Sequence, residues 1–280
     1  MQSILSIQSH VVYGYVGNKA AVYPLQYMGY DVWPINTVQF SNHTGYGQWT
    51  GEVAASDLIY SLVQGLKNIG QTCNCAAVLS GYMGTQAICQ AVQGVVQDFK
   101  TQNKKVWYLC DPVIGNNTCY VKPEVLDFFK TQLLADIITP NQYEASLLSG
   151  IALHDMASVK KAAEFFHRRG INIVVITGLS LIEHPKTLVV FVSDANSQYC
   201  IQTLEYVFDI PVNGAGDLFS SLYLGVFLKT QDSAKALQYT VFFMQKVLKN
   251  TYDINARELQ VLSVRYDDPE IALLPDLMKF

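Results

Sequence analysis

The chain has 280 residues, half of them hydrophobic, and a formal net charge of −4 at pH 7. This length is enough to bury the core of one large α/β domain or of two small ones. The negative charge and the absence of a Lys or Arg cluster argue against nucleic acid or an anionic membrane surface as a partner.

The cysteines and the N-terminus suggest a compartment. Six cysteines are scattered along the chain without metal-ligand spacing, which favours free thiols and a cytoplasmic location. The N-terminus lacks a basic segment followed by an apolar stretch, so no signal peptide is expected. No apolar run approaches the ~18 residues that a membrane span needs.

Strand-like and helix-like segments alternate through most of the chain. Apolar runs predict buried strands at residues 4–7, 76–79, 106–110, 137–139 and 173–177. Helical spacing occurs between and after them, at residues 17–28, 56–69, 85–102, 123–134 and 158–169. This alternation predicts a mainly parallel sheet with helices on both faces.

The last third of the chain changes pattern. Residues 187–192 and 198–204 predict an antiparallel hairpin, and residues 217–228 and 233–249 predict two long helices. No repeat or linker divides the sequence, so we expect one doubly wound α/β domain over residues 1–280, with a small antiparallel β-excursion. Residues 267–280 show no regular pattern.

A glycine-rich turn, Gly214 to Asp217, opens the first of these long helices. Free backbone N–H groups and the positive end of the helix dipole favour a phosphate there, and the glycines let a ligand approach the main chain. Asp217 could then act as a base, although a plain N-capping Asp is the alternative for this motif alone. The helix N-terminus is expected to favour the ionised form of Asp217.

Polar residues follow four of the predicted strands. Ligands of open parallel sheets bind at the carboxyl ends of the strands, so these positions are candidates for one cleft. Each could instead be an ordinary turn or cap. They are Gln8 to His10, Ser80 to Gly84, Asp111 with Pro112, and Thr139 to Asn141.

Six stretches together carry a family resemblance. They are residues 8–18 (QSHVVYGYVGN), 38–47 (VQFSNHTGYG), 80–82 (SGY), 110–115 (CDPVIG), 139–144 (TPNQYE) and 214–217 (GAGD). The set resembles the pyridoxal kinases, members of the ribokinase superfamily. The last two stretches mark only the superfamily, whereas the first two are specific to pyridoxal kinases. The resemblance runs from the first strand to the helix after Asp217, and weakly into residues 267–271.

The resemblance implies a kinase that transfers the γ-phosphoryl group of ATP to the 5′-hydroxymethyl group of pyridoxal, and also of pyridoxine and pyridoxamine. Asp217 would be the general base, and Gly214, Ala215 and Gly216 would hold the phosphoryl group. The resemblance implies that five further residues bind the vitamer: Ser9 at the ring nitrogen, Thr44 beside the ring substituents, Tyr82 by stacking, and Val16 and Phe40 by packing. Core packing is a strong alternative for Val16 and Phe40.

The same resemblance implies an ATP site with Mg²⁺. The implied ATP-binding residues are Asp111, Tyr120, Asn141, Glu144, Thr177, Gly178, Val212, Gly214 and Gly216. Asp111 and Glu144 would lie near Mg²⁺ or its waters, and Thr139 near a monovalent cation such as K⁺. For Glu144 the alternative is a favourable acid in the first turn of a helix. Pyridoxal kinases are typically homodimers, so a homodimer is expected.

Two positions depart from the family pattern. Gly178 stands where relatives often have a hydroxyl, and Ala215 stands where many have Thr. Each loses one side-chain hydrogen bond to phosphate. His10 and His43 lack metal-ligand partners, and we expect them to form structural hydrogen bonds.

Two other functions remain open. A hydroxymethylpyrimidine kinase would have the same fold, although residues 38–47 disfavour it. A non-catalytic carrier of a B6 vitamer or of pyridoxal phosphate could discard the base, whereas Asp217 is present. A NAD-dependent dehydrogenase is disfavoured because no Gly-x-Gly-x-x-Gly follows the first strand.

Overall fold

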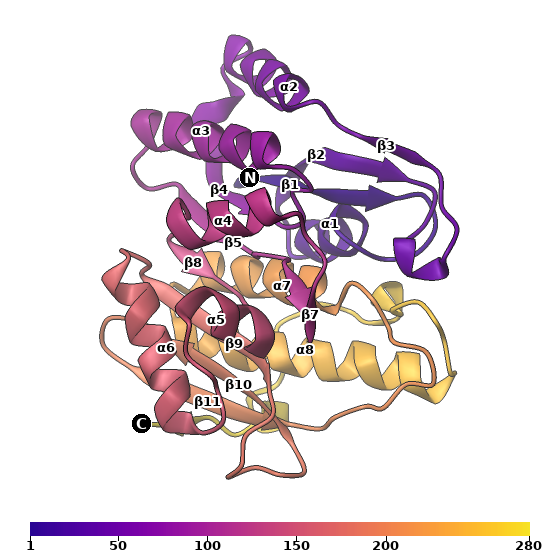
Figure 1. The fold of residues 1–280 in the computed structure, drawn as a ribbon, viewed down its shortest axis with the longest axis vertical. Coiled ribbons are helices and arrows are strands. Elements are labelled where there is room, and N and C mark those ends of the chain that lie inside the picture. The colour runs from indigo at the N-terminus through magenta and orange to yellow at the C-terminus, as the bar shows by residue number, and fades with distance from the viewer.

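The computed structural model describes all 280 residues, and a single ten-stranded sheet runs through the molecule (Figure 1). Its strand order is β12-β11-β10-β9-β8-β5-β4-β1-β2-β3. The strands are β1 (Ser3–Val11), β2 (Asp31–Phe40), β3 (Gly51–Val53), β4 (Cys75–Ser80), β5 (Trp107–Cys110), β8 (Ile137–Ile138), β9 (Ile173–Leu179), β10 (Leu188–Ser193), β11 (Gln198–Thr203) and β12 (Met278–Lys279). A separate small ribbon pairs β6 (Gly115–Asn116) with β7 (Thr118–Cys119).

The centre of the sheet is parallel and both of its edges are antiparallel. All neighbouring pairs from β2 to β9 in the strand order run parallel. Strand β3 adds antiparallel to β2, while β10, β11 and β12 add antiparallel beyond β9. The predicted hairpin is β10 with β11, so the expected β-excursion is confirmed.

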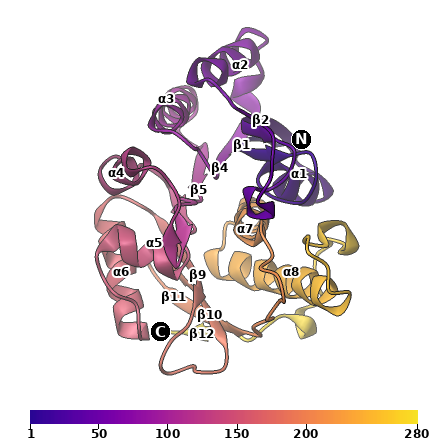
Figure 2. The same cartoon turned by 45° about the vertical axis from the view of Figure 1, so that its right-hand side comes forward.

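Helices cover both faces of the sheet (Figure 2). They are α1 (Asn18–Tyr27), α2 (Ser56–Asn68), α3 (Gln86–Gln102), α4 (Pro123–Thr131), α5 (Gln142–Ser149), α6 (Met156–Arg168), α7 (Ala215–Thr230) and α8 (Ser233–Asp253). One buried cluster lies between the sheet and α2 to α6, and a second lies between the sheet and α1, α7 and α8. The doubly wound arrangement follows from these two cores. None of the helices is long and apolar enough to cross a membrane.

Helix α7 is buried along most of its length. All residues from Leu218 to Leu228 are buried, and the helix packs against both α1 and α8. A helix that is apolar all round belongs in a core. This burial anchors the helix that begins at the glycine turn.

The sequence reasoning missed strand β2. Its alternation is broken by Pro34 and by polar residues such as Asn36 and Gln39, so no clean apolar run marks it. Pro34 lies in the part of β2 that only β1 borders, because β3 pairs only with Val38 to Phe40. A missing N–H is tolerated at such an edge. The tail, which showed no pattern, ends in β12 at the other edge of the sheet.

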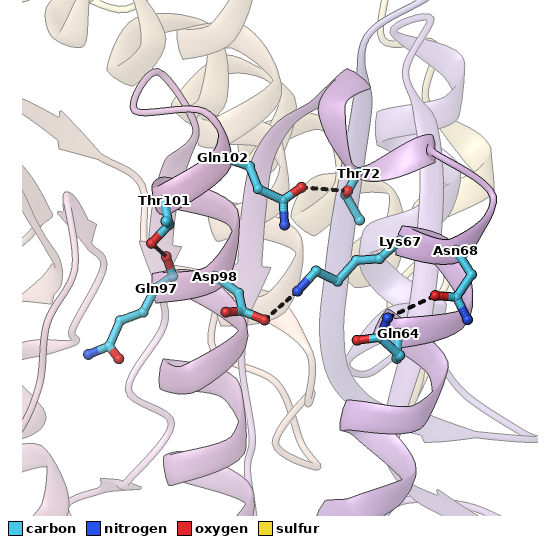
Figure 3. Close-up of polar contacts among 8 residues, drawn as sticks. All are labelled: Gln64, Lys67, Asn68, Thr72, Gln97, Asp98, Thr101 and Gln102. Carbon is cyan, nitrogen blue, oxygen red and sulfur yellow. Dashed lines mark hydrogen bonds and ion pairs between the residues drawn. The ribbon is translucent and has the colours of Figure 1, made fainter.

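Polar contacts join α3 to α2 and to the short 3₁₀ turn that follows α2 (Gln71–Asn74) (Figure 3). Lys67 of α2 donates to Asp98 of α3 at 2.7 Å, and Thr72 of the 3₁₀ turn donates to Gln102 of α3 at 2.9 Å. The Asp98 side chain is 57% exposed, and ion pairs with this exposure contribute about 0–1 kcal/mol. Burial of Ile59 and Val63 therefore holds α2 in place more than its charges do.

Candidate active site

The glycine turn meets the carboxyl ends of the parallel strands. A side chain added at Gly216 would lie 3.4 Å from Oδ2 of Asp111, which follows β5. Gly214 is the N-cap residue of α7, with φ 87° and no side-chain cap. A Cβ there would lie only 1.9 Å from the carbonyl oxygen of Tyr15, so only glycine fits. The N–H groups of the first turn of α7, beginning at Ala215, receive no side-chain cap.

A second glycine-capped helix begins beside the first. Gly17, the N-cap of α1, has φ 55°, and it also lacks a side-chain cap. A Cβ at Gly17 would lie 2.4 Å from Oγ of Ser9, and the Gly17 backbone N–H bonds the Asp217 carboxylate. Ser9, Gly17 and Asp217 therefore lie in one contiguous group.

Asp217 differs from the prediction in its pKa. Burial raises the pKa of Asp217 from 3.8 to about 6, and the hydrogen bond from the Gly17 N–H only partly opposes this rise. Burial outweighs the expected preference of the helix N-terminus for the ionised form, so Asp217 is more basic than predicted, although a carboxyl group with this pKa is still mostly ionised at pH 7. A carboxyl group with a pKa near 6 is a better base than a free Asp.

A hydroxyl chain connects three elements behind the turn. Ser220 of α7 donates to Oδ2 of Asp111 at 2.9 Å. Its oxygen lies 2.8 Å from Oγ1 of Thr139, which must then be the donor. All three side chains are buried. Sequence reasoning missed Ser220, although its position three residues after Asp217 on the same helix face was an available signal.

The surroundings of Asp111 disfavour the ionised form of its carboxyl group. Burial raises the pKa of Asp111 well above its usual range, and the charges of Glu144 and Asp217 raise it further. No Lys or Arg forms an ion pair with any of these three carboxylates. Such a cluster favours the approach of a cation.

Glu144 lies in the first turn of a helix, as the sequence indicated, and it also bonds a distant loop. Together with Asn141 it forms a capping box at the start of α5. Its Oε1 accepts from the backbone N–H groups of Ile114 and Gly115 at 2.8 and 3.2 Å, while its Oε2 accepts from Asn141 at 2.9 Å. Asn141 also donates to the Gly115 carbonyl. Oε1 of Glu144 thus fixes the start of the β6–β7 ribbon, while Oε2 completes the cap of α5.

The vitamer-side candidates lie in β1, at the end of β2 and on loops around this group. Val16 is buried, Tyr82 is half-buried, and Thr44 is exposed at the start of a short 3₁₀ turn (Thr44–Tyr46). The ring of Phe40 lies 4.2 Å from that of Trp49, centroid to centroid. A Cβ at Gly45 would lie 3.7 Å from Nδ2 of Asn213, so the Thr44 turn borders the glycine turn.

The remaining nucleotide-side candidates are more dispersed. Thr177 donates its N–H to the Pro140 carbonyl at 3.0 Å, which places it beside Asn141. Gly178 has φ 61°, a conformation that a hydroxyl-bearing residue would adopt only with strain. Val212 packs against the core around α7, and Tyr120 is 58% exposed.

The two histidines form structural hydrogen bonds, as predicted. Nδ1 of His43 accepts from the Gly45 N–H at 3.1 Å, and Nδ1 of His10 lies 3.2 Å from the Gln39 amide. Burial lowers the pKa of both rings.

Comparison with known proteins agrees with this arrangement. Residues 54–261 match the family model described as phosphomethylpyrimidine kinase. The chain is 37% identical to a pyridoxal kinase PdxY of Corynebacterium diphtheriae over 264 residues, which cover 93% of each protein. It is 39% identical to a pyridoxal kinase PdxY of Granulibacter bethesdensis over 274 residues, which cover 95% of each.

The chain belongs to the pyridoxal kinase family. Pyridoxal kinase from Leishmania donovani, in complex with ADP and ginkgotoxin, superimposes with a TM-score of 0.91 at 31% identity and 100% coverage of both chains. The complex of the same enzyme with ADP and pyridoxamine gives a TM-score of 0.90 at 30% identity. The resemblance and the fold class expected from the sequence are thereby confirmed.

Proposed function

We propose that residues 1–280 act as one kinase domain that transfers the γ-phosphoryl group of ATP to the 5′-hydroxymethyl group of pyridoxal. Pyridoxine and pyridoxamine are expected as further substrates. The observation that supports this most directly is Asp217, a carboxyl group with a raised pKa at the open, glycine-capped N-terminus of α7. The family's name and its ADP complexes agree with this chemistry.

The catalytic step uses groups of this chain in three roles. Asp217 accepts the hydroxymethyl proton as the oxygen forms its bond to the γ-phosphorus and the bond to ADP breaks. The N–H groups at Ala215 and Gly216 stabilise the phosphoryl oxygens. Because the transition state is loose, positioning contributes more than proton removal. Ser9, Thr44 and Tyr82, with Val16 and Phe40, would orient the vitamer ring.

The nucleotide would lie across the ends of β5, β8 and β9. We assign this role to Asp111, Tyr120, Asn141, Glu144, Thr177, Gly178 and Val212. Glu144 would act indirectly, since its oxygens already accept backbone N–H groups.

The carboxylate cluster fits a hard divalent cation that arrives with ATP. Oxygen donors suit Mg²⁺, and no Lys or Arg forms an ion pair with Asp111, whose pKa is raised by burial. No group of three His, Cys, Asp or Glu side chains is arranged to hold a metal by itself. Asp111 would therefore hold Mg²⁺ chiefly through its waters, with Glu144 nearby. When bound, Mg²⁺ would neutralise charge on the phosphates.

Three further properties are part of the proposal. Thr139 would lie near a monovalent cation such as K⁺, and the protein would form a homodimer. The six free thiols support a cytoplasmic location.

One experiment separates the candidate functions. ATP-dependent phosphorylation of pyridoxal, pyridoxine, pyridoxamine and hydroxymethylpyrimidine is measured side by side. The last substrate is included because the matching family model is described as phosphomethylpyrimidine kinase. We expect the highest kcat/KM with a B6 vitamer. Turnover of hydroxymethylpyrimidine alone would favour the sister kinase, and vitamer binding without turnover would favour a carrier.

A further inference from the structure

Two residues after α8 contact loops from the opposite end of the chain. Oε2 of Glu258 accepts from the backbone N–H of Tyr15 at 3.0 Å. Its Oε1 accepts from the hydroxyl of Tyr46 at 2.6 Å. One half-buried carboxylate thus joins the loop after β1 to the turn that contains Thr44.

Arg257 holds the same turn from a second direction. Its guanidinium carbon lies 3.4 Å from the centroid of the Tyr46 ring, and Nη2 donates to the Gly45 carbonyl at 3.2 Å. The ring of Tyr13 meets the Tyr46 ring edge-on at 6.1 Å. Tyr46 is therefore fixed by a cation, a carboxylate and another ring.

The loop after β1 fits closely around Glu258. A Cβ at Gly14 would lie 2.4 Å from Oε2 of Glu258, so the carboxylate occupies the space that any larger residue would need. Gly14 also has φ 96°. The sequence places a glycine here for this contact.

These contacts lead directly to the proposed catalytic base. The peptide of Tyr15 gives its N–H to Glu258, and its carbonyl oxygen packs on Gly214, the N-cap of α7. Two residues after Tyr15, the Gly17 N–H reaches Asp217. Glu258 therefore acts at one end of a continuous run of backbone whose other end contacts Asp217.

We propose that Glu258, supported by Arg257, is a positioning residue that holds the 13–17 loop and the 43–47 turn in register with the Asp217 turn. This inference rests on the proposed function, because the two loops contain or adjoin the vitamer-side residues. Glu258 itself touches neither substrate. Its loss should weaken the vitamer side and spare the ATP side, which is built on β5, β8 and α5.

The experiment compares Glu258→Ala, Glu258→Gln and Tyr46→Phe with Glu270→Ala as the matched control. Glu270 is an exposed carboxylate of the same tail, and its side chain forms no ion pair. We expect Glu258→Ala to raise the KM for pyridoxal by about tenfold, the scale of a lost charged hydrogen bond, with the KM for ATP within about twofold. Glu258→Gln should recover most of the loss, because its amide oxygen can accept from Tyr15 and its NH₂ can donate to Tyr46.

A double variant tests whether Glu258 acts through Tyr46. The effects of Glu258→Ala and Tyr46→Phe on the KM for pyridoxal should be less than additive, because both remove the same hydrogen bond. Additive effects would contradict the shared contact. Equal increases in the KM for pyridoxal and for ATP would show a general structural role and overturn the inference.

Amide hydrogen exchange gives a readout that needs no turnover. In the intact protein the Tyr15 amide should be protected, and Glu258→Ala should speed its exchange by about tenfold while amides of β5 stay unchanged. Unchanged exchange at Tyr15 would refute the proposal even if the protein phosphorylates pyridoxal. If the protein phosphorylates no vitamer, the proposed function fails, and faster exchange would still show that Glu258 orders the loop.

Discussion

Replacing Asp217 with Asn tests both the chemistry and the electrostatics of the site. The amide keeps the shape of the side chain but can neither accept a proton nor carry a charge. We expect kcat for pyridoxal to fall by about 10²- to 10⁴-fold, the usual contribution of a general base, with little change in vitamer affinity. The same substitution should make the folded protein more stable at neutral pH.

The size of the gain follows from the raised pKa. The difference between 3.8 and about 6 for the Asp217 carboxyl corresponds to about 3 kcal/mol of native-state cost for the ionised form. Asp217 keeps partial contact with solvent, which reduces the expected gain to about 1–2 kcal/mol. The Asp217 charge also raises the pKa of Asp111 and Glu144, so its removal acts in the same direction there.

The sign of the pH dependence is fixed by the direction of the shift. The native state binds the Asp217 proton more tightly than the unfolded chain, so the wild type loses stability as the pH rises from about 4 to about 6. The advantage of Asp217→Asn should therefore be complete above pH 6 and absent below pH 4. At about 2 °C per kcal/mol for a protein of this size, it corresponds to about 2–4 °C in Tm.

Thermal unfolding of the wild type and the variant between pH 4.5 and 8 measures this difference. Asp268→Asn, at an exposed carboxylate without a hydrogen bond, serves as the control and should show no pH-dependent gain. The reasoning is refuted if Asp217→Asn is no more stable than the wild type at pH 7.5, or if its advantage grows as the pH falls. Unchanged kcat would remove Asp217 from the mechanism.

Two further substitutions test the frame around Asp217. Gly214→Ala should destabilise the protein by several kcal/mol and abolish turnover, because the new Cβ would lie 1.9 Å from the Tyr15 carbonyl oxygen. The control Gly29→Ala, at a residue with φ 92° but open space around it, should cost only about 1 kcal/mol and keep activity. Urea unfolding and kcat measurements check both expectations. Equal costs at the two glycines would contradict the close approach. Ser220→Ala removes the hydrogen bond to Asp111 and should raise the KM for ATP by about three- to tenfold, with the KM for pyridoxal unchanged. A change confined to the KM for pyridoxal would show that Ser220 acts on the vitamer side of the site.

The elements that the sequence predicted well are those with a strong apolar period. Helix α3 was expected at residues 85–102 and spans Gln86–Gln102, with buried positions such as Ile88, Val92 and Val95 facing the sheet. Strand β2 was missed because one edge pairs with β1 along its whole length, whereas the other edge is free beside Pro34 and pairs with β3 only from Val38 to Phe40. Such a strand has no single period for sequence reasoning to detect.

The site shows the same division between local and tertiary effects. Local patterns located the Asp217 turn and the helix start with Glu144 in its first turn, because helix starts depend on residues that are near in sequence. The contacts of Glu144 with Ile114 and Gly115, and of Glu258 with Tyr15, join residues far apart in the chain. No spacing rule could predict them.

The pKa of Asp217 depends on which of two opposing effects is larger. The helix N-terminus does favour a carboxylate, but typically by only 0.3–1 kcal/mol, and the Gly17 N–H adds one hydrogen bond. Burial against α1 and the glycine turn acts on the charged form itself and can shift a pKa by several units. The helix N-terminus can be predicted from the sequence, whereas burial cannot, because burial depends on how α1, α7 and β5 come together. A base whose pKa lies near 6 is thus a product of the fold: the motif supplies the carboxyl group, and the packing around it makes it basic enough to take a proton.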